Sequence, residues 1–330
     1  MKAVHVTGPG QIEVIDGPEP ALEADQVMLR PVTATLARDD VRRVYDGAGG
    51  GYPLPAGASA HELVARVVEA RYNAREWREY QPGELVAFYG TQAIGLAETV
   101  VVPHSTVYWL PPAEDPDLQA VPTARPLGQV IEACNTFPPL ATACAAVVGQ
   151  GSSGLLFDAL LARMGAGVVA GIDTRPERVA AAGRFGATLA LVPGADTVQQ
   201  VQDANGGFLA DVVVETSGTT DGLRLAVDLV RPGGRLHLFG APNESLYHLD
   251  AAALTAKRFE VQASGAGIED ATPYWSPYGA AMNLVLRGEV DTRPMLTHRF
   301  PLERAAEAFE LARTGDDGAL KVSIDFGDDG

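Results

Sequence analysis

The stretch VVGQGSSGLLFDALLARMGA, residues 147–166, decides the fold of this 330-residue chain. An apolar run leads into a glycine turn, and a segment with helical spacing follows it and ends at a glycine. Gly149, Gly151 and Gly154 form the pattern G-x-G-x-x-G at the join. The first glycine permits the tight turn, the second lets a pyrophosphate approach the backbone, and the third allows close helix–strand packing. The stretch therefore predicts a dinucleotide site.

Two neighbouring features complete this site. Ser152 and Ser153 open the helix, whose first amides and partial positive charge favour phosphate binding. Asp173 ends the next apolar run about 20 residues on, where a carboxylate can accept both ribose hydroxyls and repel a 2′-phosphate. This favours NAD over NADP, although Arg175 and Arg178 follow directly and an arginine can accommodate a 2′-phosphate. The alternative is a glycine-rich turn that binds nothing.

The rhythm of the chain changes near Cys144. The first 110 residues or so contain short β-branched runs, such as KAVHVTG and ELVARVVEA, separated by Gly, Pro and Asp signals. From Cys144 onward, apolar strands alternate with helical patterns, which predicts a parallel sheet with helices on both faces. The fold class is therefore α/β, with a β-rich part before a doubly wound sheet.

Composition excludes several classes of function. A net charge of −17 repels phosphate backbones and anionic lipid, so we expect no nucleic-acid partner and no membrane. The apolar runs are too short to cross a bilayer, and the start of the chain lacks a signal peptide, which predicts a cytoplasmic location. Only two cysteines occur, which excludes a disulfide framework and a four-cysteine zinc lobe.

Several segments together resemble the medium-chain dehydrogenase/reductase superfamily, on its zinc-dependent alcohol, polyol and threonine dehydrogenase side. They are ASAHE, VVGQGSSG, DVVVETSG, LVRPGGRLHLFG, LTHRFPLERAAEAFE and ALKVSIDF. The resemblance covers nearly the whole chain. It implies a GroES-like catalytic domain over residues 1–123, a Rossmann NAD-binding domain over 124–265, and a return to the catalytic domain over 266–330.

The same resemblance implies that the catalytic zinc site has been dismantled. Ala37 stands where the family has its first ligand, a cysteine, and Arg125 stands where polyol-type members have a glutamate ligand. His61 matches the second ligand and Glu62 matches its neighbouring glutamate. A catalytic zinc needs about three protein ligands, and a permanently charged guanidinium repels the ion. We therefore expect no metal.

Other groups would then manage charge and protons. Arg125 is a fixed positive charge for a carbonyl, an alkoxide or a carboxylate. Asp39 matches the position of the family's proton-relay Ser/Thr and could exchange a proton directly or through His61, whose ordinary pKa suits acid–base work. The candidate catalytic residues are thus His61, Asp39, Arg125 and Glu62. The alternative is that Arg125, Asp39 and Glu62 form an ion-pair network without a catalytic role.

Further cofactor contacts follow from matched positions and from strand ends. Arg38 and Lys321 match family positions that often contact the pyrophosphate, and Asp40 matches an acidic residue that typically pairs with the lysine. The alternative is a surface salt-bridge cluster. Ligands bind at the carboxyl ends of parallel strands, where plain turn chemistry is the alternative. The residues at those ends are Thr216, Ser217, Gly240 and Ala241. Candidates for lining the substrate cleft are Tyr52, Tyr274, Trp275 and Tyr278, and packing between domains is the alternative.

The sequence thus predicts a zinc-independent NAD(H)-dependent oxidoreductase that interconverts a secondary alcohol and its ketone. The small-molecule substrate would be a polyol, a cyclitol or a hydroxy acid. Three alternatives stay open: an NADPH-dependent enoyl or quinone reductase, a net non-redox enzyme with tightly bound NAD, and a catalytically silent nucleotide-binding homologue. Because family members commonly pair through the edge strand of the Rossmann sheet, here near RFEVQAS, we expect a homodimer.

Overall fold

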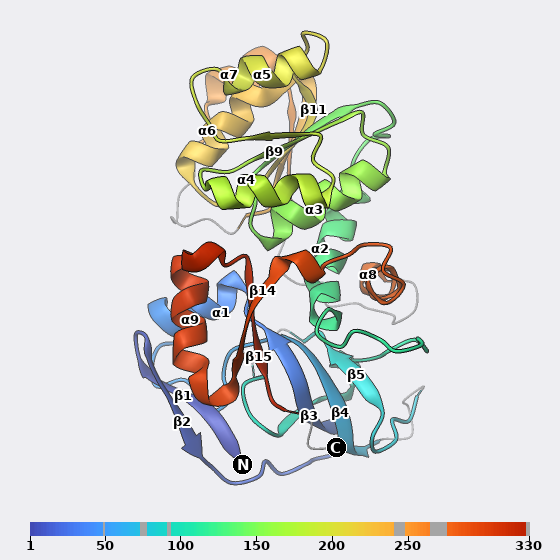
Figure 1. The fold of residues 1–330 in the computed structure, drawn as a ribbon, viewed down its shortest axis with the longest axis vertical. Helices are drawn as coiled ribbons and strands as arrows, with labels where there is room; N and C mark the ends of the chain where they lie inside the picture. Colours follow the sequence, from blue (N-terminus) through green and yellow to red (C-terminus); the bar gives the residue numbers. More distant parts are fainter. Residues whose placement is uncertain (49, 73–77, 91–93, 241–247, 265–275, 328–330) are drawn as a thin grey trace. The chain divides into compact units, whose positions relative to one another are not determined.

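The computed structural model describes residues 1–330 except 49, 73–77, 91–93, 241–247, 265–275 and 328–330 (Figure 1). The chain divides into two units, Met1–Arg125 with Tyr278–Gly330, and Pro126–Pro277. The borders suggested by the sequence, after residues 123 and 265, fall a little before these changeovers. The predicted fold class is confirmed, because one unit is built on a parallel α/β sheet and the other on a largely antiparallel sheet.

The unit Pro126–Pro277 carries a six-stranded sheet in the order β10-β9-β8-β11-β12-β13, and every neighbouring pair is parallel. Its strands are β8 (Cys144–Val148), β9 (Val168–Ile172), β10 (Leu189–Leu191), β11 (Ala210–Glu215), β12 (Val230–Leu238) and β13 (Glu260–Ala263). Its helices include α3 (Ser152–Arg163), α4 (Pro176–Ala182), α5 (Thr197–Ala204), α6 (Thr220–Leu229) and α7 (Ala251–Lys257). Helix α2 (Ala124–Cys134) leads into this unit.

Continuous apolar strands form the centre of this sheet. Every residue of β8 is buried, and α3 packs against β8 and β9 while α6 packs against β8, β11 and β12. Helices α3 and α4 lie together, as do α5 and α6, so the sheet is covered on both faces (Figure 1). Val148, Ile172 and Val213 belong to this core. Each such buried side chain contributes about 1.5–3 kcal/mol of transfer free energy.

The other unit contains a two-stranded sheet, β1-β2, and a seven-stranded sheet in the order β14-β15-β3-β4-β5-β7, with β6 also paired to β3. The strands are β1 (Lys2–Gly8), β2 (Gln11–Asp16), β3 (Gln26–Thr35), β4 (Glu62–Arg71), β5 (Leu85–Phe88), β6 (Val100–Pro103), β7 (Val107–Trp109), β14 (Leu296–Pro301) and β15 (Lys321–Asp325). The helices include α1 (Arg38–Asp46), α8 (Pro277–Leu286) and α9 (Ala305–Thr314).

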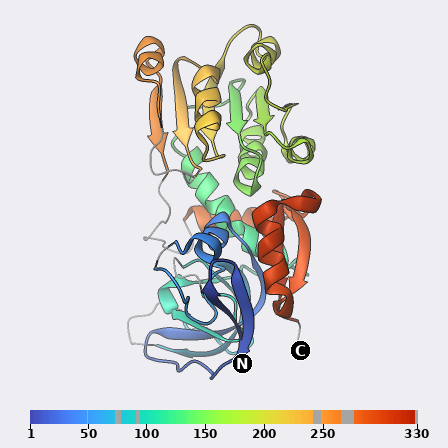
Figure 2. The same cartoon turned by 90° about the vertical axis from the view of Figure 1, so that its left-hand side faces the viewer.

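The pairing of β15 with β3 brings the last strand of the chain into the seven-stranded sheet (Figures 1 and 2). Ser323 on β15 pairs with Thr35, the last residue of β3, and Thr35 pairs with Glu62, the first residue of β4. Lys321, which opens β15, therefore comes to the same end of the sheet. One sheet end thus gathers polar side chains from three strands that are far apart in the sequence.

The strands quoted in the sequence analysis all appear, but α1 and α2 were not predicted. Helix α2 contains Pro126 in its first turn, where the backbone nitrogen has no helical acceptor and proline is tolerated. Helix α1 begins among the charged residues after Ala37 and carries only two buried side chains. Among the helices that the structure describes, none is long and apolar enough to cross a membrane.

Candidate functional site

The glycine turn lies where the strand order of the parallel sheet reverses. From β8 the chain proceeds to β9 and β10 on one side, whereas β11, β12 and β13 follow on the other side. Such a switch point at the carboxyl ends of the strands is where open α/β sheets bind ligands. Val148 ends β8 there, and its carbonyl oxygen accepts hydrogen bonds from the backbone N–H and the hydroxyl of Thr216 at 2.8 and 3.1 Å.

The three glycines of the turn have different physical roles. Gly149 has φ +96°, and an added Cβ would lie 2.7 Å from the backbone nitrogen of Ser217. A Cβ on Gly154 would lie 1.9 Å from the carbonyl oxygen of Gly149. Packing therefore requires glycine at both positions. A Cβ on Gly151 would meet nothing within 4 Å, so this backbone faces open space, as the approach of a pyrophosphate requires.

The first turn of α3 is open to an anion. Gly151 is the N-cap residue and provides no side-chain hydrogen bond to the first helical amides. The twelve-residue helix continues with Ser152 and Ser153, both half-buried. Free amide donors together with the helix dipole attract negative charge, as the sequence analysis expected.

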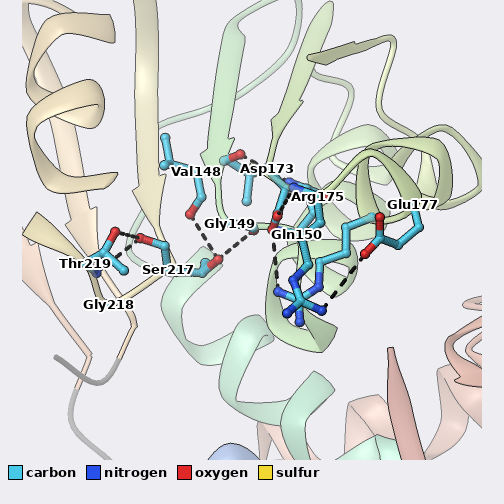
Figure 3. A network of polar contacts seen from close by, with 12 residues as sticks. Val148, Gly149, Gln150, Asp173, Arg175, Glu177, Ser217, Gly218 and Thr219 are labelled. Carbon is cyan, nitrogen blue, oxygen red and sulfur yellow. Dashed lines mark hydrogen bonds and ion pairs between the residues drawn. The ribbon is translucent and has the colours of Figure 1, made fainter. Parts of the chain in front are cut away.

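Asp173 anchors the turn from the end of β9. It is 8% exposed, its Oδ2 accepts the backbone N–H of Gln150 at 2.7 Å, and its Oδ1 accepts that of Arg175 at 2.9 Å (Figure 3). Arg178 forms an ion pair with the same carboxylate at 3.7 Å, and its buried Nε has no hydrogen-bond partner among the described residues. Each carboxylate oxygen keeps a lone pair for a ribose hydroxyl. Together, the glycine cradle, the helix end and Asp173 fit a dinucleotide.

The residues at the end of β11 build the wall of this turn. Thr216 donates to the carbonyl oxygen of Gly149 at 2.7 Å, and the hydroxyl of Ser217 donates to the fully buried Glu215. A Cβ on Gly240 would lie 2.7 Å from the backbone of Thr216, so this position too needs glycine. Contact of Thr216, Ser217 and Gly240 with a cofactor stays a prediction. Ala241, Tyr274 and Trp275 lie outside the described residues.

In the other unit, His61 is held by Asp40. The Nδ1 atom of His61 lies 3.1 Å from Oδ1 of Asp40, which also accepts the backbone N–H of Ala60 at 2.8 Å. Oδ2 accepts the backbone N–H of Ala37 at 2.8 Å. Burial tends to raise the pKa of this fully buried carboxyl, but the charge of His61 and these hydrogen bonds outweigh it and hold the pKa below its ordinary value. Asp40 is therefore ionised at neutral pH.

This arrangement corrects the sequence-based choice between two adjacent acids. Asp39 is exposed on α1, and it is Asp40, not Asp39, that contacts His61. Because an ionised carboxylate only accepts hydrogen bonds, neutral His61 carries its proton on Nδ1 and presents Nε2 as an acceptor. The pair therefore has the chemistry of an oriented general base.

Glu62 and Lys321 form a separate buried pair beside it. Nζ of Lys321 lies 2.7 Å from Oε2 of Glu62, and both side chains are about 3% exposed. Thr35 donates to the same oxygen at 2.5 Å. The predicted pairing of Lys321 with Asp40 is therefore wrong, since Asp40 is used by His61. Contact of Arg38 and Lys321 with a pyrophosphate stays a prediction; Arg38 is exposed, whereas Lys321 is buried.

Arg125 lies among tyrosines. Its side chain is buried. Burial raises the pKa values of Tyr89 and Tyr108, and the positive charge of Arg125 opposes only part of this rise. The ring of Tyr89 lies 4.8 Å from that of Tyr108 and 5.2 Å from that of Tyr278, centroid to centroid. Tyr278 is one of the aromatic residues that the sequence analysis placed at a cleft. Tyr52 instead donates to the carbonyl oxygen of Val44 in the core of the same unit.

Known proteins share this architecture and part of this sequence. Residues 154–277 match the family model described as "Zinc-binding dehydrogenase". L-threonine 3-dehydrogenase of Symbiobacterium thermophilum is 30% identical over 252 residues, which are 75% of this chain and 69% of that protein. This chain belongs to the zinc-binding dehydrogenase family, within the medium-chain dehydrogenases.

One further relative and one solved structure illustrate the range of the likeness. L-threonine 3-dehydrogenase of Saccharopolyspora erythraea is 31% identical over 70% of this chain, and the match spans only 64% of that enzyme's length. The crystal structure of galactitol-1-phosphate dehydrogenase from Escherichia coli superposes with a TM-score of 0.85 at 21% identity, covering 98% of this chain and 99% of that one. The second likeness concerns the fold alone.

The family name raises the question of whether this chain can hold zinc. A catalytic zinc takes three protein ligands from Cys, His, Asp or Glu. In the described part of the chain, no group of three or more such side chains could hold a metal ion. His61 has Asp40 on its Nδ1, Glu62 is occupied by Lys321, and Arg125 adds a positive charge. The donor set present in these residues does not fit the ion.

Sequence reasoning missed Asp40 as the partner of His61, and it missed Tyr89 and Tyr108 altogether. A signal for Asp40 was available, since an acid at the third position of a helix can reach back to the N-cap amide. Nothing local marks Tyr89 or Tyr108, because Tyr108 lies on β7 whereas Tyr89 follows β5, and only the pairing of these strands brings them together. Their role depends on how the sheet is paired.

Proposed function

We propose that this chain is an NAD(H)-dependent oxidoreductase that interconverts a secondary alcohol and its ketone by hydride transfer, without a catalytic zinc ion. The substrate class we propose is a polyol, a cyclitol or a hydroxy acid. The observation that carries the proposal is the 3.1 Å contact between Asp40 and Nδ1 of His61. It provides a proton carrier at a position where zinc-type relatives are expected to use a metal ligand. L-threonine, named for the two threonine dehydrogenases, also carries a secondary hydroxyl.

The nucleotide would be held by the parallel-sheet unit. Gly151 and the first turn of α3 would receive the pyrophosphate, and Asp173 would accept the ribose hydroxyls. When bound, NAD accepts or returns the hydride in this chemistry. Because a carboxylate placed to bind the ribose accepts both hydroxyls and repels a 2′-phosphate, we propose NAD rather than NADP. Arg178, which forms an ion pair with Asp173, is the group that could weaken this preference.

The proton would pass through His61. In the oxidation direction, Nε2 accepts the proton of the substrate hydroxyl while the hydride leaves the same carbon, and a ketone forms. The negative charge of Asp40 stabilises the imidazolium that results, since it lies 3.1 Å away and is shielded from water. General acid–base catalysis of this kind contributes roughly 10²–10⁴-fold to a rate. Arg125 supplies fixed positive charge for the developing alkoxide or for another anionic group.

The decisive experiment is the zinc content per chain by elemental mass spectrometry, on untagged protein never exposed to chelator, followed by turnover assays. We expect near-zero zinc, and NAD⁺ reduction with secondary alcohols such as butane-2,3-diol or L-threonine that a chelator does not inhibit. About one zinc per chain with chelator-sensitive turnover would refute the metal-free proposal. His61→Ala should slow turnover while NADH affinity is spared.

Other outcomes would select the alternatives. NADPH oxidation with an activated alkene would favour an enoyl or quinone reductase. NADH binding without turnover of alcohols or ketones would favour a silent homologue or a net non-redox enzyme. Asp173→Ala should weaken NAD more than NADP, and equal weakening would count against its ribose role.

We also propose that the protein is a cytoplasmic homodimer. Strand β13 forms an edge of the described parallel sheet and carries the exposed Val261. An edge strand has unpaired backbone groups that a second copy can satisfy. Light scattering of the purified protein should give twice the chain mass, and Val261→Lys should lower it to that of one chain.

A further inference from the structure

Arg125 is buried, and no described residue provides it with a counter-charge. Its side chain is 6% exposed, and no hydrogen bond or ion pair joins its guanidinium to any described residue. Its Nε is fully enclosed and has no acceptor. Burying an unpaired charge costs several kcal/mol, so such groups normally have a partner. The missing partner of Arg125 is therefore an anion that the described chain does not provide.

Tyr89 is a second unsatisfied group in the same cluster. Its hydroxyl is buried and has no hydrogen-bond partner among the described residues. Burial raises the pKa of Tyr89 well above its ordinary value, and the neighbouring Arg125 opposes only part of this shift. At neutral pH the phenol therefore keeps its proton and is available as a donor. Two unsatisfied donors, one of them charged, call for an acceptor with negative charge.

Aromatic rings surround these donors. Tyr89 and Tyr108 have centroids 4.8 Å apart, Tyr89 and Tyr278 are 5.2 Å apart, and Tyr108 and Tyr278 are 6.2 Å apart. Buried aromatic rings near a cation exclude water and lower the local dielectric constant, which strengthens its attraction to an anion. In the same surroundings, an unpaired charge on Arg125 has a high desolvation free energy, so an anion that pairs with it would be strongly bound.

The charge balance favours a monoanion. Lys321, the other buried cation near Glu62, is already neutralised by that carboxylate at 2.7 Å. Arg125 is thus the cation in this described cluster that lacks a partner. One guanidinium balances one carboxylate and matches its two oxygens in a bidentate geometry, whereas a phosphate dianion would leave an excess negative charge.

We propose that Arg125 and Tyr89 form a subsite for the carboxylate of a substrate, which narrows the substrate class to short hydroxy acids and their oxo acids. This inference rests on the proposed alcohol–ketone chemistry of His61. In it, the guanidinium of Arg125 binds the carboxylate and Tyr89 donates to the same group or to the neighbouring oxygen. The rings of Tyr108 and Tyr278 restrict access of water.

The kinetic test uses matched substrate pairs in which a carboxylate is replaced by a neutral hydroxymethyl group. The pairs are 2-hydroxybutyrate with butane-1,2-diol and 3-hydroxybutyrate with butane-1,3-diol, each with NAD⁺. We expect kcat/KM to be at least 100-fold higher for one of the acids than for its diol. Arg125→Gln should lower kcat/KM of that acid about 10²–10³-fold, and the loss for its diol should be at least about tenfold smaller. Equal values for acid and diol, or equal losses for both, would overturn the subsite.

Direct binding and stability keep the test independent of turnover. By calorimetry, the wild-type protein should bind oxamate, a stable analogue of a 2-oxo acid, and Arg125→Gln should weaken binding about 100-fold or more. Tyr89→Phe should weaken it about tenfold. Neutral oxamide should bind neither protein. Because the variant removes an unpaired buried charge, its melting temperature without ligand should equal or exceed that of wild type; a lower one would indicate a structural ion pair and refute the proposal.

The outcomes separate this inference from the proposed function. Oxidation of diols through His61 without any preference for acids would support the proposed function and refute the carboxylate subsite. Binding of oxamate that depends on Arg125, without turnover of any alcohol, would support the carboxylate subsite and refute the proposed function. A preference for glycerol 1-phosphate over both hydroxy acids, lost in Arg125→Gln, would overturn the assignment to a carboxylate.

Discussion

Replacing Asp40 by Asn tests the central contact of the site. The carboxylate accepts three donors, which are the backbone N–H groups of Ala37 and Ala60 and Nδ1–H of His61, at 2.8, 2.8 and 3.1 Å. An amide has one oxygen, so it keeps two of these bonds as neutral ones and turns an NH₂ group toward the N–H of Ala37. The substitution therefore changes charge and hydrogen bonding at almost constant volume.

The expected loss of stability follows from these bonds. A hydrogen bond to a charged group contributes about 1.5–3 kcal/mol and a neutral one about 0.5–1.5 kcal/mol, so the two retained bonds weaken by about 1 kcal/mol each. The third bond is lost outright. Because the amide avoids the desolvation of a buried carboxylate, part of this loss is offset, and we expect the free energy of unfolding to fall by about 2–3 kcal/mol. Urea denaturation followed by circular dichroism measures it.

The expected loss of activity is larger. Without the carboxylate, His61 loses its fixed tautomer and the charge that stabilises its protonated form, so kcat should fall about 10²–10⁴-fold, the full range of general acid–base catalysis. Absorbance of NADH reports it. The matched control is Asp39→Asn, which makes the same change one residue earlier on an exposed side chain and should shift stability by less than about 0.5 kcal/mol. Equal effects of the two variants, or near wild-type turnover of Asp40→Asn, would refute the reasoning.

Three further predictions follow from the described contacts. Because the pKa of Asp40 lies below its ordinary value of 3.8, the ionised carboxylate stabilises the fold above that pH, and this stabilisation disappears as the pH falls through the lower pKa of the folded state. The difference in unfolding free energy between wild type and Asp40→Asn should therefore shrink only below about pH 3.8, and a decrease of that difference at higher pH would contradict the prediction. Gly151→Ala should change the free energy of unfolding by less than about 0.5 kcal/mol, measured by thermal melts, yet weaken NADH binding at least about tenfold, measured by fluorescence titration. Gly154→Ala should melt at a much lower temperature than wild type, because its Cβ clashes with the carbonyl oxygen of Gly149. Lys321→Met should lower the free energy of unfolding by about 3–5 kcal/mol, because it leaves the buried carboxylate of Glu62 without a counter-charge. Adding Glu62→Gln should restore part of this stability, and urea midpoints that show no recovery in the double variant would argue against a buried ion pair.

The nucleotide-binding turn could be predicted because its geometry is local. Gly149, Gly151 and Gly154 lie within six residues of one another, and the backbone conformation and close packing that they permit recur wherever a strand enters a helix in this way. Asp173 follows from the length of one helix and one strand. The alternation of apolar strands and helices likewise fixed the fold class, because side-chain periodicity reports which face of an element is buried.

The acid–base site could be predicted only in part. The sequence indicated that Ala37 and Arg125 stand where zinc-type relatives have ligands and that His61 is retained, but it could not tell which of two adjacent aspartates faces inward. Successive residues of a helix point about 100° apart, so the orientation of α1 against the sheet decides this, and it buries Asp40 while leaving Asp39 in solvent.

By itself, then, the sequence determined the α/β class, the glycine turn and the absence of the expected thiol and glutamate ligands. The tertiary structure alone decided the partners: Asp40 with His61, Lys321 with Glu62, and Tyr89 with the unpaired Arg125. The physical reason is that local patterns encode backbone conformation and burial. Contacts between β15 and β4, far apart along the chain, depend on sheet pairing, which a local pattern does not specify.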